Sequence, residues 1–301
     1  MSSATLSRSG IAALVLLWFV WGYTWVAMKE AVRFADPLDF SALRTIPGAA
    51  LMFAAMLWLR KPFRLRSPGR TLVFGLFQTT AFNAFAAWAL VSGAAGKTAV
   101  LVYTFPFWTL VIACSVLGER IRGLQWPAAG LAAAGLILVL EPWHLGGTLA
   151  SKLLALATAV AWAISAVLAK KWRAELEPDL LALNAWQMLM GGIVLTAITV
   201  VMPSRPVDWT PYFWVMLIYC TVFGTVAGWL LWLFILQRLP ASIAGLSIMA
   251  VPVFGVLASR VQLGERPGGL EFTGMLLIGA SLALLSWPSL REGREMGNGK
   301  W

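Results

Sequence analysis

The chain has 301 residues, of which 60% are hydrophobic and 12% charged, and its formal net charge is +10. Soluble domains carry about 25% charged residues, and this much apolar surface would leave large exposed patches on a globule in water. The Lys and Arg residues lie in short segments between apolar runs rather than in one basic stripe, which argues against nucleic acid as a partner. The composition predicts an all-α integral membrane protein.

Apolar runs long enough to cross a bilayer recur along the whole chain. A hydrocarbon core of about 30 Å requires roughly 20 apolar helical residues, and the first run is longer than the core of a signal peptide. We predict ten transmembrane helices, near residues 11-28, 40-59, 71-91, 99-117, 124-140, 151-169, 180-201, 211-236, 241-259 and 270-287.

The cations alternate between the two sides of this arrangement. If the N-terminus is cytoplasmic, that side receives 15 of the 23 Lys and Arg residues. Short loops rich in Lys and Arg remain in the cytoplasm. Both termini are therefore predicted to be cytoplasmic, with residues 291-301 as a cytoplasmic tail.

The sequence LGER occurs at 117-120 and again at 263-266, and each copy begins 11 residues after a proline, Pro106 or Pro252. Trp21 and Trp162 correspond near the start of each half. We interpret residues 1-145 and 146-290 as diverged five-helix repeats, the alternative being chance similarity of helices rich in Leu, Ala and Gly. Because five is odd, the second repeat would be inverted in the membrane. The glutamate of each LGER copy is interpreted as a cap and anchor at the end of a helix.

Ten spans in two halves, a proline in the fourth and ninth spans, and G-E-R after each of these spans resemble the EamA-type branch of the drug/metabolite transporter superfamily. The resemblance covers nearly the whole chain. Within that branch, the aromatic-rich and basic sequence is similar to the YddG-type exporters of aromatic and other neutral amino acids. The resemblance implies a carrier in a bacterial inner membrane, with a cavity between two halves that opens alternately to each side.

Neutral polar side chains lie deep within several spans. Thr79 and Asn83 share one helical face, and Asn83 requires a partner because an unsatisfied amide in hydrocarbon costs about 2-7 kcal/mol. That partner is either a neighbouring helix or a cargo. Similar groups on other spans are Thr158, Trp162, Ser165, Gln187 and Thr225. They suit a neutral or zwitterionic molecule better than a phosphate, which would require buried Arg or Lys.

Most of the 17 Trp residues are expected at the membrane interfaces. Trp21 is an exception, because it lies about 10-15 Å into the first span. Trp21 and Trp25 either pack between helices or form an aromatic wall that stacks against a planar cargo. Tyr103 and Trp229 are further candidates for this wall.

The 13 acidic residues lie in connections, tails or outer turns of spans, and the lone His144 lies in a connection. Coupled carriers commonly place an ionisable side chain at membrane depth, so we expect facilitated diffusion or an unconventional coupling. Arg44 and Lys152, near span ends, would attract a carboxylate at the mouth of the cavity or extend to the interface.

Pro106 and Pro252 cannot donate backbone hydrogen bonds and are predicted to bend their helices. They would act either as hinges or as static kinks.

We therefore expect an inner-membrane exporter of aromatic and other neutral amino acids, or related small metabolites, that works by alternating access. The lipid bilayer and a small-molecule substrate are its expected partners, and the oligomeric state is left open. The alternatives on the same fold are exporters of lipophilic cations or drugs, or of phosphorylated sugars. No cofactor or metal site is expected. An enzyme is disfavoured by the single His and the lack of HExxH or GxSxG, and a channel by the lack of a filter-like segment or charged ring.

Overall fold

A computed structural model of the chain describes residues 8–120, 123–141, 149–238, 248 and 250–298, with the backbone alone for 285–298. The regular secondary structure of the described residues is helical, without a strand. His144, the first part of the predicted span 241-259 and the last residues of the predicted tail lie outside the described residues.

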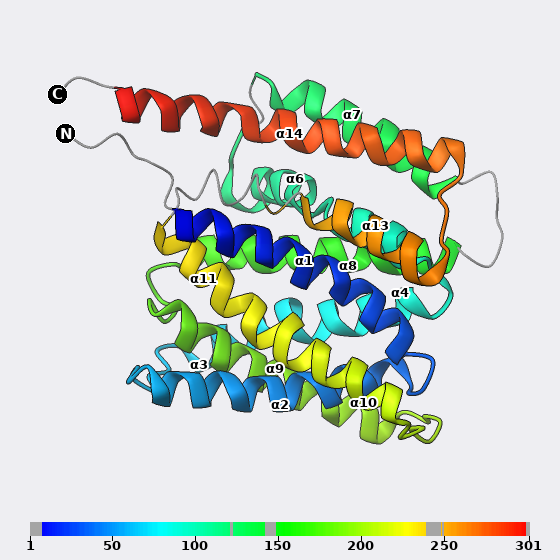
Figure 1. The fold of residues 1–301 in the computed structure, drawn as a ribbon. Helices are drawn as coiled ribbons and strands as arrows, with labels where there is room; N and C mark the ends of the chain where they lie inside the picture. Colours follow the sequence, from blue (N-terminus) through cyan, green and yellow to red (C-terminus); the bar gives the residue numbers. More distant parts are fainter. Residues whose placement is uncertain (1–7, 121–122, 142–148, 239–247, 249, 299–301) are drawn as a thin grey trace.

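The first half is built from helices that run back and forth across one bundle (Figure 1). Its elements are α1 (Arg8–Ala31), α2 (Pro37–Trp58), α3 (Pro68–Gly75), the π-helical segment η1 (Leu76–Ala81), α4 (Phe82–Ser92), α5 (Ala95–Val102), α6 (Phe105–Leu117) and α7 (Gln125–Leu140).

The second half is also helical where the structure describes it. Its elements are α8 (Leu149–Lys171), α9 (Leu180–Val201), α10 (Pro211–Ile218), the π-helical segment η2 (Tyr219–Ala227), α11 (Gly228–Arg238), α13 (Ala250–Leu263) and α14 (Gly269–Asn298). A π-helical segment thus interrupts the third span of each half.

Side-chain caps explain where several of these helices begin. The carboxylate of Asp36 accepts from the Leu38 N–H at the start of α2. Asp179 accepts from two N–H groups at the start of α9, and Thr210 accepts from the Phe213 N–H at the start of α10. Each cap satisfies a backbone donor that has no partner within the helix.

Seven helical stretches of the described chain are long and apolar enough to cross a membrane. They correspond to the first four predicted spans and to the sixth, seventh and eighth. Three shorter apolar helices, at Gln125–Leu140, Ala250–Leu263 and Gly269–Leu284, overlap the remaining predicted ranges. The fold is an all-helical membrane bundle, and the count of ten transmembrane helices stays a prediction.

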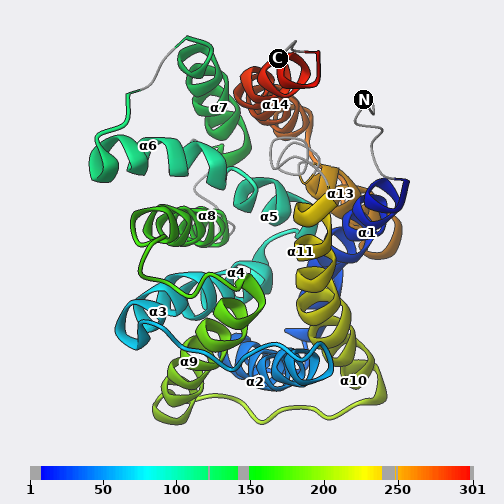
Figure 2. The ribbon, with the colours of Figure 1, turned by 90° about the vertical axis from the view of Figure 1, so that its left-hand side faces the viewer.

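Helices of the two halves pack against each other in a reciprocal pattern (Figure 2). α1 packs against α13 of the second half, while α8 packs against α5 and α6 of the first. α2 packs against α9, and α7 against α14. Each half therefore contributes its first helix to a contact with the fourth span of the other half.

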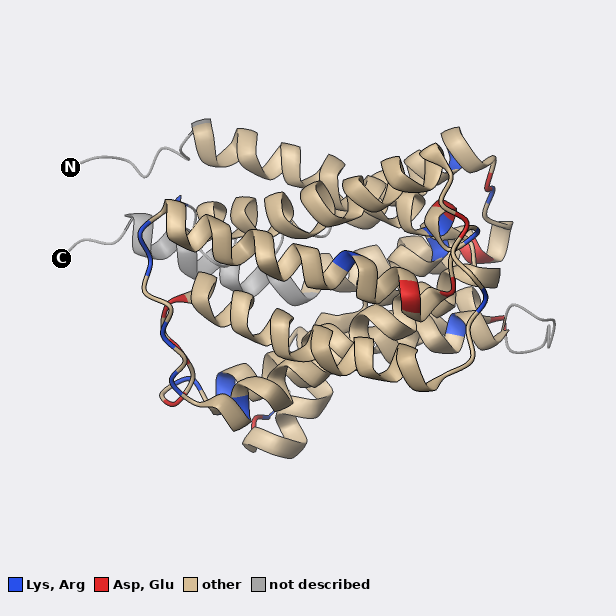
Figure 3. Ribbon diagram, turned by 90° about the horizontal axis from the view of Figure 1, so that it is seen from below, with Lys and Arg blue, Asp and Glu red and all other residues tan. Residues whose placement is uncertain are grey.

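α1 and α8 run in opposite directions. Lys29, near the end of α1, donates to the Leu90 carbonyl at 2.7 Å, and Ser151, near the start of α8, donates to the Ala89 carbonyl of the same α4 turn. We call the end where α1 begins and α14 ends the terminal end, and the opposite end the distal end (Figure 1). Figure 3 shows that charged residues of the described chain gather mainly at these two ends.

Candidate functional site

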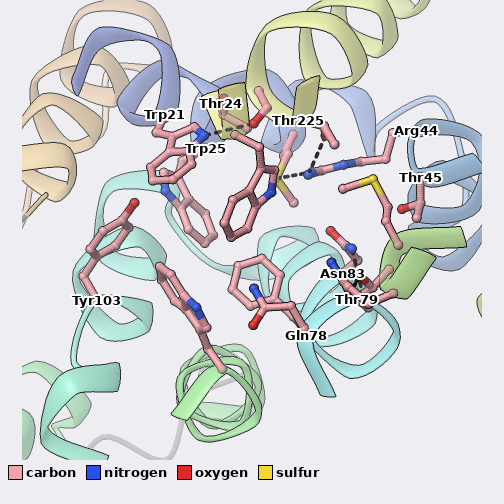
Figure 4. A pocket seen from close by; sticks show the side chains of 17 residues that line it. Trp21, Thr24, Trp25, Arg44, Thr45, Gln78, Thr79, Asn83, Tyr103 and Thr225 are labelled. Carbon is pink, nitrogen blue, oxygen red and sulfur yellow. Dashed lines mark hydrogen bonds between the residues drawn. The ribbon is translucent and has the colours of Figure 1, made fainter. Parts of the chain in front are cut away.

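A cavity lies in the middle of the bundle, with walls from both halves. Figure 4 shows Arg44, Thr45, Thr79 and Asn83 on one side of it and Trp21 and Tyr103 on the other. The lining residues are Trp21, Thr24, Trp25, Met28, Arg44, Thr45, Gln78, Thr79, Phe82, Asn83, Tyr103, Trp162, Gln187, Met188, Gly224, Thr225 and Trp229.

The structure brings nine of the eleven residues proposed from the sequence to this cavity. These nine are Trp21, Trp25, Thr79, Asn83, Tyr103, Trp162, Gln187, Thr225 and Trp229. Thr158 and Ser165 are buried but do not line the cavity. The Thr158 hydroxyl donates to the Leu154 carbonyl of its own helix, whereas the Ser165 hydroxyl contacts the Gln78 amide oxygen. A role of any of these residues in binding stays a prediction.

Arg44 reaches the cavity from α2, which begins at Pro37 and so places this residue two turns inside the helix. Its side chain is buried, and Nη1 lies 2.9 Å from the Met28 sulfur while Nη2 lies 3.4 Å from the Thr225 hydroxyl. Arg44 thus lines the cavity and is buried in the protein, and its attraction for a carboxylate stays a prediction. Because a thioether is a weak acceptor, this guanidinium has poor compensation for its lost hydration.

The described lining of the cavity contains no residue with a formal charge other than Arg44. No ion pair of Arg44 occurs among the described residues. An isolated buried cation attracts an anion from solution strongly, because the low surrounding polarity screens the attraction little. The cavity is therefore electropositive on its α2 side.

Lys152 does not line the cavity, and its extension to the interface stays a prediction. Its ammonium is buried at the distal end, donates to the Leu140 carbonyl at 2.9 Å and lies 3.6 Å from the Glu141 carboxylate. Glu271, ion-paired with Lys97, lies 3.9 Å from the same ammonium. Lys152 thus belongs to a charged cluster away from the cavity.

Asn83 is held by its own helix. Its side-chain N–H donates to the Thr79 carbonyl at 2.9 Å, and its backbone carbonyl accepts from the Ser41 hydroxyl of α2 at 3.1 Å. Because a carbonyl only accepts, the first bond sets the orientation of the amide. The Asn83 Oδ1 atom is buried and has no hydrogen-bond partner.

The side chains of Thr79 and Gln187 bond to each other and so connect two helices. The Thr79 hydroxyl donates to the Gln187 amide oxygen at 2.7 Å, and the neighbouring Thr80 hydroxyl donates to the Gly191 carbonyl at 2.7 Å. These bonds join η1 to α9 and fix the wall that carries Asn83.

Trp21 forms one aromatic surface of the cavity. Its indole N–H donates to the Gly224 carbonyl at 3.0 Å, and its ring meets Trp229 edge-on at a centroid distance of 5.8 Å. A Cβ on Gly228 would lie only 2.1 Å from the Trp21 indole nitrogen. Gly228 therefore makes room for the ring, and Trp21 both packs between helices and lines the cavity.

Trp162 forms the second aromatic surface. It stacks on Phe105 at a centroid distance of 3.8 Å and meets Tyr103 and Phe82 edge-on at 5.7 and 5.5 Å. Trp25 is buried in the main core and also reaches the lining. The two indoles that correspond in the sequence thus present apolar surface to one cavity.

Both π-helical segments contribute to the lining. η1 carries Gln78 and Thr79, and η2 carries Gly224 and Thr225. The Thr225 hydroxyl donates to the Cys220 carbonyl at 2.9 Å, five residues earlier. π-Helical turns occur frequently at functional sites, and this pair marks the cavity independently of residue type.

The two prolines lie near the starts of helices as far as the structure describes them. The predicted span 99-117 consists of α5 and α6, with a break at Tyr103 and Thr104, and Pro106 is in the first turn of α6. Pro252 is the third residue of α13. This placement suits proline, because first-turn N–H groups have no partner within the helix. Their role as hinges stays a prediction.

The two LGER copies end α6 and α13 in the same way. Gly118 and Gly264 have φ of +68° and +67°, a conformation that favours glycine. The following Glu N–H bonds to the carbonyl six residues earlier in each case, which folds the chain back over the last turn of the helix. The motif is therefore first a signal that terminates a helix.

Glu265 caps a helix of the other half. Its carboxylate accepts from the Ala95 N–H at 2.9 Å and from the Gly96 N–H at 3.2 Å, at the start of α5. The expectation of a helix cap therefore holds for Glu265, but the capped helix is not its own. Glu119 instead contacts the Lys170 ammonium, and both of these side chains are largely exposed.

Sequence reasoning missed several lining residues: Thr24, Met28, Arg44, Thr45, Gln78, Phe82, Met188 and Gly224. The sequence does single out Arg44, but only near the end of its span, because the predicted span begins at 40. The Asp36 cap and Pro37 mark the true start of the helix and would have located Arg44 at depth. Gly224 carries no chemical signal, since it acts through its backbone carbonyl.

The EamA-like transporter family matches residues 8–141 and 149–287 of the chain. The chain is 28% identical over 275 residues to the uncharacterized transporter YoaV of Bacillus subtilis, covering 89% of this chain and 92% of YoaV. It is 27% identical over 285 residues to a protein of Escherichia coli named "probable amino-acid metabolite efflux pump", covering 90% of this chain and 92% of that protein.

One solved crystal structure has the same fold. Its TM-score to this chain is 0.65 at 21% sequence identity, and the similarity covers 94% of this chain and 98% of the other. At this identity the likeness concerns the fold alone.

Proposed function

Because the chain belongs to the EamA-like transporter family, we propose that it exports amino acids, aromatic and other neutral ones, or closely related small metabolites. The observation that carries this proposal is the chemistry of the cavity, in which a buried guanidinium without a counterion among the described residues faces apolar aromatic surfaces. An amino acid offers both a carboxylate and a side chain of matching character. The name of the Escherichia coli relative agrees with this substrate class.

The two halves act as inverted repeats that work by alternating access. The opposite directions of α1 and α8 and the reciprocal packing between the halves support this mechanism. At the distal end, Glu265 joins the segment after α13 to the start of α5, and Lys29 binds the end of α4. We infer that these contacts close this end. Transport then requires the contact between α5 and α13 to open.

Transport proceeds by facilitated diffusion through a bacterial inner membrane, with both termini cytoplasmic. None of the described residues that line the cavity is acidic or histidine, so this wall offers no ordinary proton acceptor. A pH-sensitive dye trapped in proteoliposomes tests this point, because a pH change that depends on cargo would contradict it.

A second candidate cargo is an organic anion without an amino group. Arg44 favours it, since a buried guanidinium binds any carboxylate or phosphate. The same residue counts against lipophilic cations, which the positive wall would repel.

Counterflow in liposomes tests the substrate class. Purified protein is reconstituted with one unlabelled compound inside, and entry of the labelled compound is followed for phenylalanine, tryptophan and methionine, and for a quaternary ammonium dye. We expect the amino acids to exchange at several times the rate in empty liposomes. Exchange of the dye alone would overturn the proposal.

A further inference from the structure

Three polar atoms in the cavity wall lack a hydrogen-bond partner: Arg44 Nε, Thr45 Oγ1 and Asn83 Oδ1. Their residues are 8%, 2% and 8% exposed, so the protein itself shields these atoms from bulk water. A buried polar atom left without a partner costs about 1-3 kcal/mol. Three such atoms on one cavity wall indicate a site completed by a ligand.

The three unpartnered atoms differ in whether they donate or accept a hydrogen bond. Arg44 Nε is a donor, and the guanidinium as a whole presents five N–H groups in a planar fork that matches a carboxylate. Its two described contacts are to a thioether and to a hydroxyl at 3.4 Å, so most of this capacity remains unused. An anionic group of the ligand belongs here.

Asn83 Oδ1 is an acceptor, since the amide N–H is directed to the Thr79 carbonyl. It would repel a carboxylate and would accept from an ammonium group. The Thr45 hydroxyl, on α2 next to Arg44, either donates or accepts. Figure 4 shows Arg44, Thr45 and Asn83 on the same side of the cavity, and all three line it.

We propose that Arg44 binds the α-carboxylate of an amino acid and Asn83 Oδ1 its α-ammonium, with the side chain of the amino acid against Trp21 and Trp162. This assignment rests on the proposed function and adds the orientation of the substrate. The reverse orientation would place an ammonium against the only charged residue of the described lining, a cation. Because every amino acid shares the recognised groups, the aromatic surfaces alone select the side chain.

The orientation has a direct consequence for ligands that lack one of the two groups. A charge-assisted hydrogen bond is worth about 1.5-3 kcal/mol, which corresponds to roughly 10-150-fold in affinity. We expect L-phenylalanine to bind at least about tenfold tighter than phenethylamine, which lacks the carboxylate, and than 3-phenylpropanoate, which lacks the ammonium.

Binding of these three probes to the purified full-length protein is compared in wild type, Arg44→Gln and Asn83→Leu. In Arg44→Gln, the preference for phenylalanine over phenethylamine should fall to nearly 1, while the preference over 3-phenylpropanoate persists. Asn83→Leu should show the opposite pattern. Arg33→Gln is the matched control, because it removes one cation from an exposed side chain outside the cavity and should leave both ratios unchanged.

Each outcome supports or overturns the assignment. Wild-type protein that binds phenethylamine as tightly as phenylalanine overturns it without any variant. Unchanged ratios in both variants overturn it while the proposed function stands, provided that counterflow of phenylalanine is intact. If wild type neither binds nor exchanges amino acids, the proposed function fails and this inference with it. If Arg44→Gln does not fold, Arg44→Lys is used in its place. Loss of the planar fork should lower the preference for phenylalanine over phenethylamine severalfold. An unchanged preference overturns the assignment.

Discussion

Glu119 and Glu265 occupy the same position in two identical tetrapeptides, and both follow a glycine that ends a helix with φ near +68°. Their side chains nevertheless have different partners. Glu265 caps α5 at the distal end, whereas Glu119 meets Lys170 at the terminal end, where their side chains are 39% and 63% exposed. The local sequence of the motif thus determines its backbone conformation. The partner of its glutamate side chain depends instead on which helix end lies beside it.

The ion pairs at the two ends of the bundle also differ in solvent exposure. At the distal end, the Lys97 and Glu271 side chains are 18% and 10% exposed, and Lys152 is buried nearby. At the terminal end, Arg70 and Glu175 pair with both side chains more than 40% exposed. Partly buried ion pairs are strong when they are intact and costly when one partner is removed, while exposed pairs contribute about 0-1 kcal/mol. Substitutions at the distal end should therefore have the larger effects.

Glu265→Gln should produce the largest change. It removes the negative charge that two N–H groups at the start of α5 contact, which weakens the closure of the distal end by about 1-3 kcal/mol. We measure maleimide labelling of Ala99→Cys, which is buried at the contact between α5 and α13, in a background without Cys114 and Cys220. Labelling should accelerate about tenfold. An unchanged labelling rate would contradict the role of Glu265 as a latch.

Lys97→Met should reduce stability by about 1-3 kcal/mol, because it leaves the Glu271 carboxylate with one ammonium fewer in a poorly hydrated position. Unfolding of the detergent-solubilised protein measures the effect. Glu271 keeps its bond from the Gly268 N–H at 3.0 Å, which limits the loss. The matched variant Lys61→Met removes an exposed partner at the terminal end and should cost less than half as much.

Asp179→Asn should cost about 0.3-1 kcal/mol at neutral pH, because Asn still caps the helix but carries no negative charge for the helix N-terminus and for Lys61. Burial alone would raise the pKa of Asp179, but the hydrogen bond from Lys61, that from the Ala182 N–H and the charge of Lys61 together hold this pKa below its ordinary value of 3.8. A lowered pKa in the folded state stabilises the fold above the ordinary pKa, and the contribution disappears as the pH falls through the folded value.

The unfolding free energies of wild type and Asp179→Asn should therefore converge as the pH falls from about 5 to below 3. A difference that stays constant with pH would exclude the ionised carboxylate as its source.

Glu119→Gln should have the smallest effect, below about 1 kcal/mol in stability, because the contact with Lys170 is exposed. Maleimide labelling of Ala99→Cys should stay within about twofold of the parent. Equal changes of the labelling rate in Glu119→Gln and Glu265→Gln would contradict the expected difference between the two ends.

Much of the helical architecture could be predicted from hydrophobicity alone. Apolar runs separated by charged connections located the helices, and the repeated LGER and Trp positions indicated related halves. The break at Tyr103 and Thr104 and the two π-helical segments could not be predicted in detail, since they depend on packing between distant helices. Gly228, for example, has no local signal for its contact with Trp21, 207 residues away along the chain.

The candidate site was predicted better for aromatic than for polar residues. Large rings at mid-span have few places to go, so the indoles proposed from their depth do reach the cavity. Ser165 and Thr158 carry hydroxyl groups as expected but do not line the cavity. Their position on a helical face does not determine which neighbouring helix that face contacts. The sequence places Arg44 too near the end of its span, because the predicted span begins three residues, about one turn of helix, after the start of α2.

The contact between α5 and α13 offers the most direct test of alternating access. A Cβ on Gly255 would lie 3.3 Å from the Cβ of Ala99, close to the 3.5-4.5 Å typical of disulfides. Ala99→Cys with Gly255→Cys, without Cys114 and Cys220, is oxidised in liposomes and assayed for phenylalanine counterflow. Each single cysteine variant under the same oxidant is the control. Oxidation of the pair should stop counterflow and reduction should restore it, whereas full counterflow in the cross-linked protein would contradict the opening of the distal end during transport.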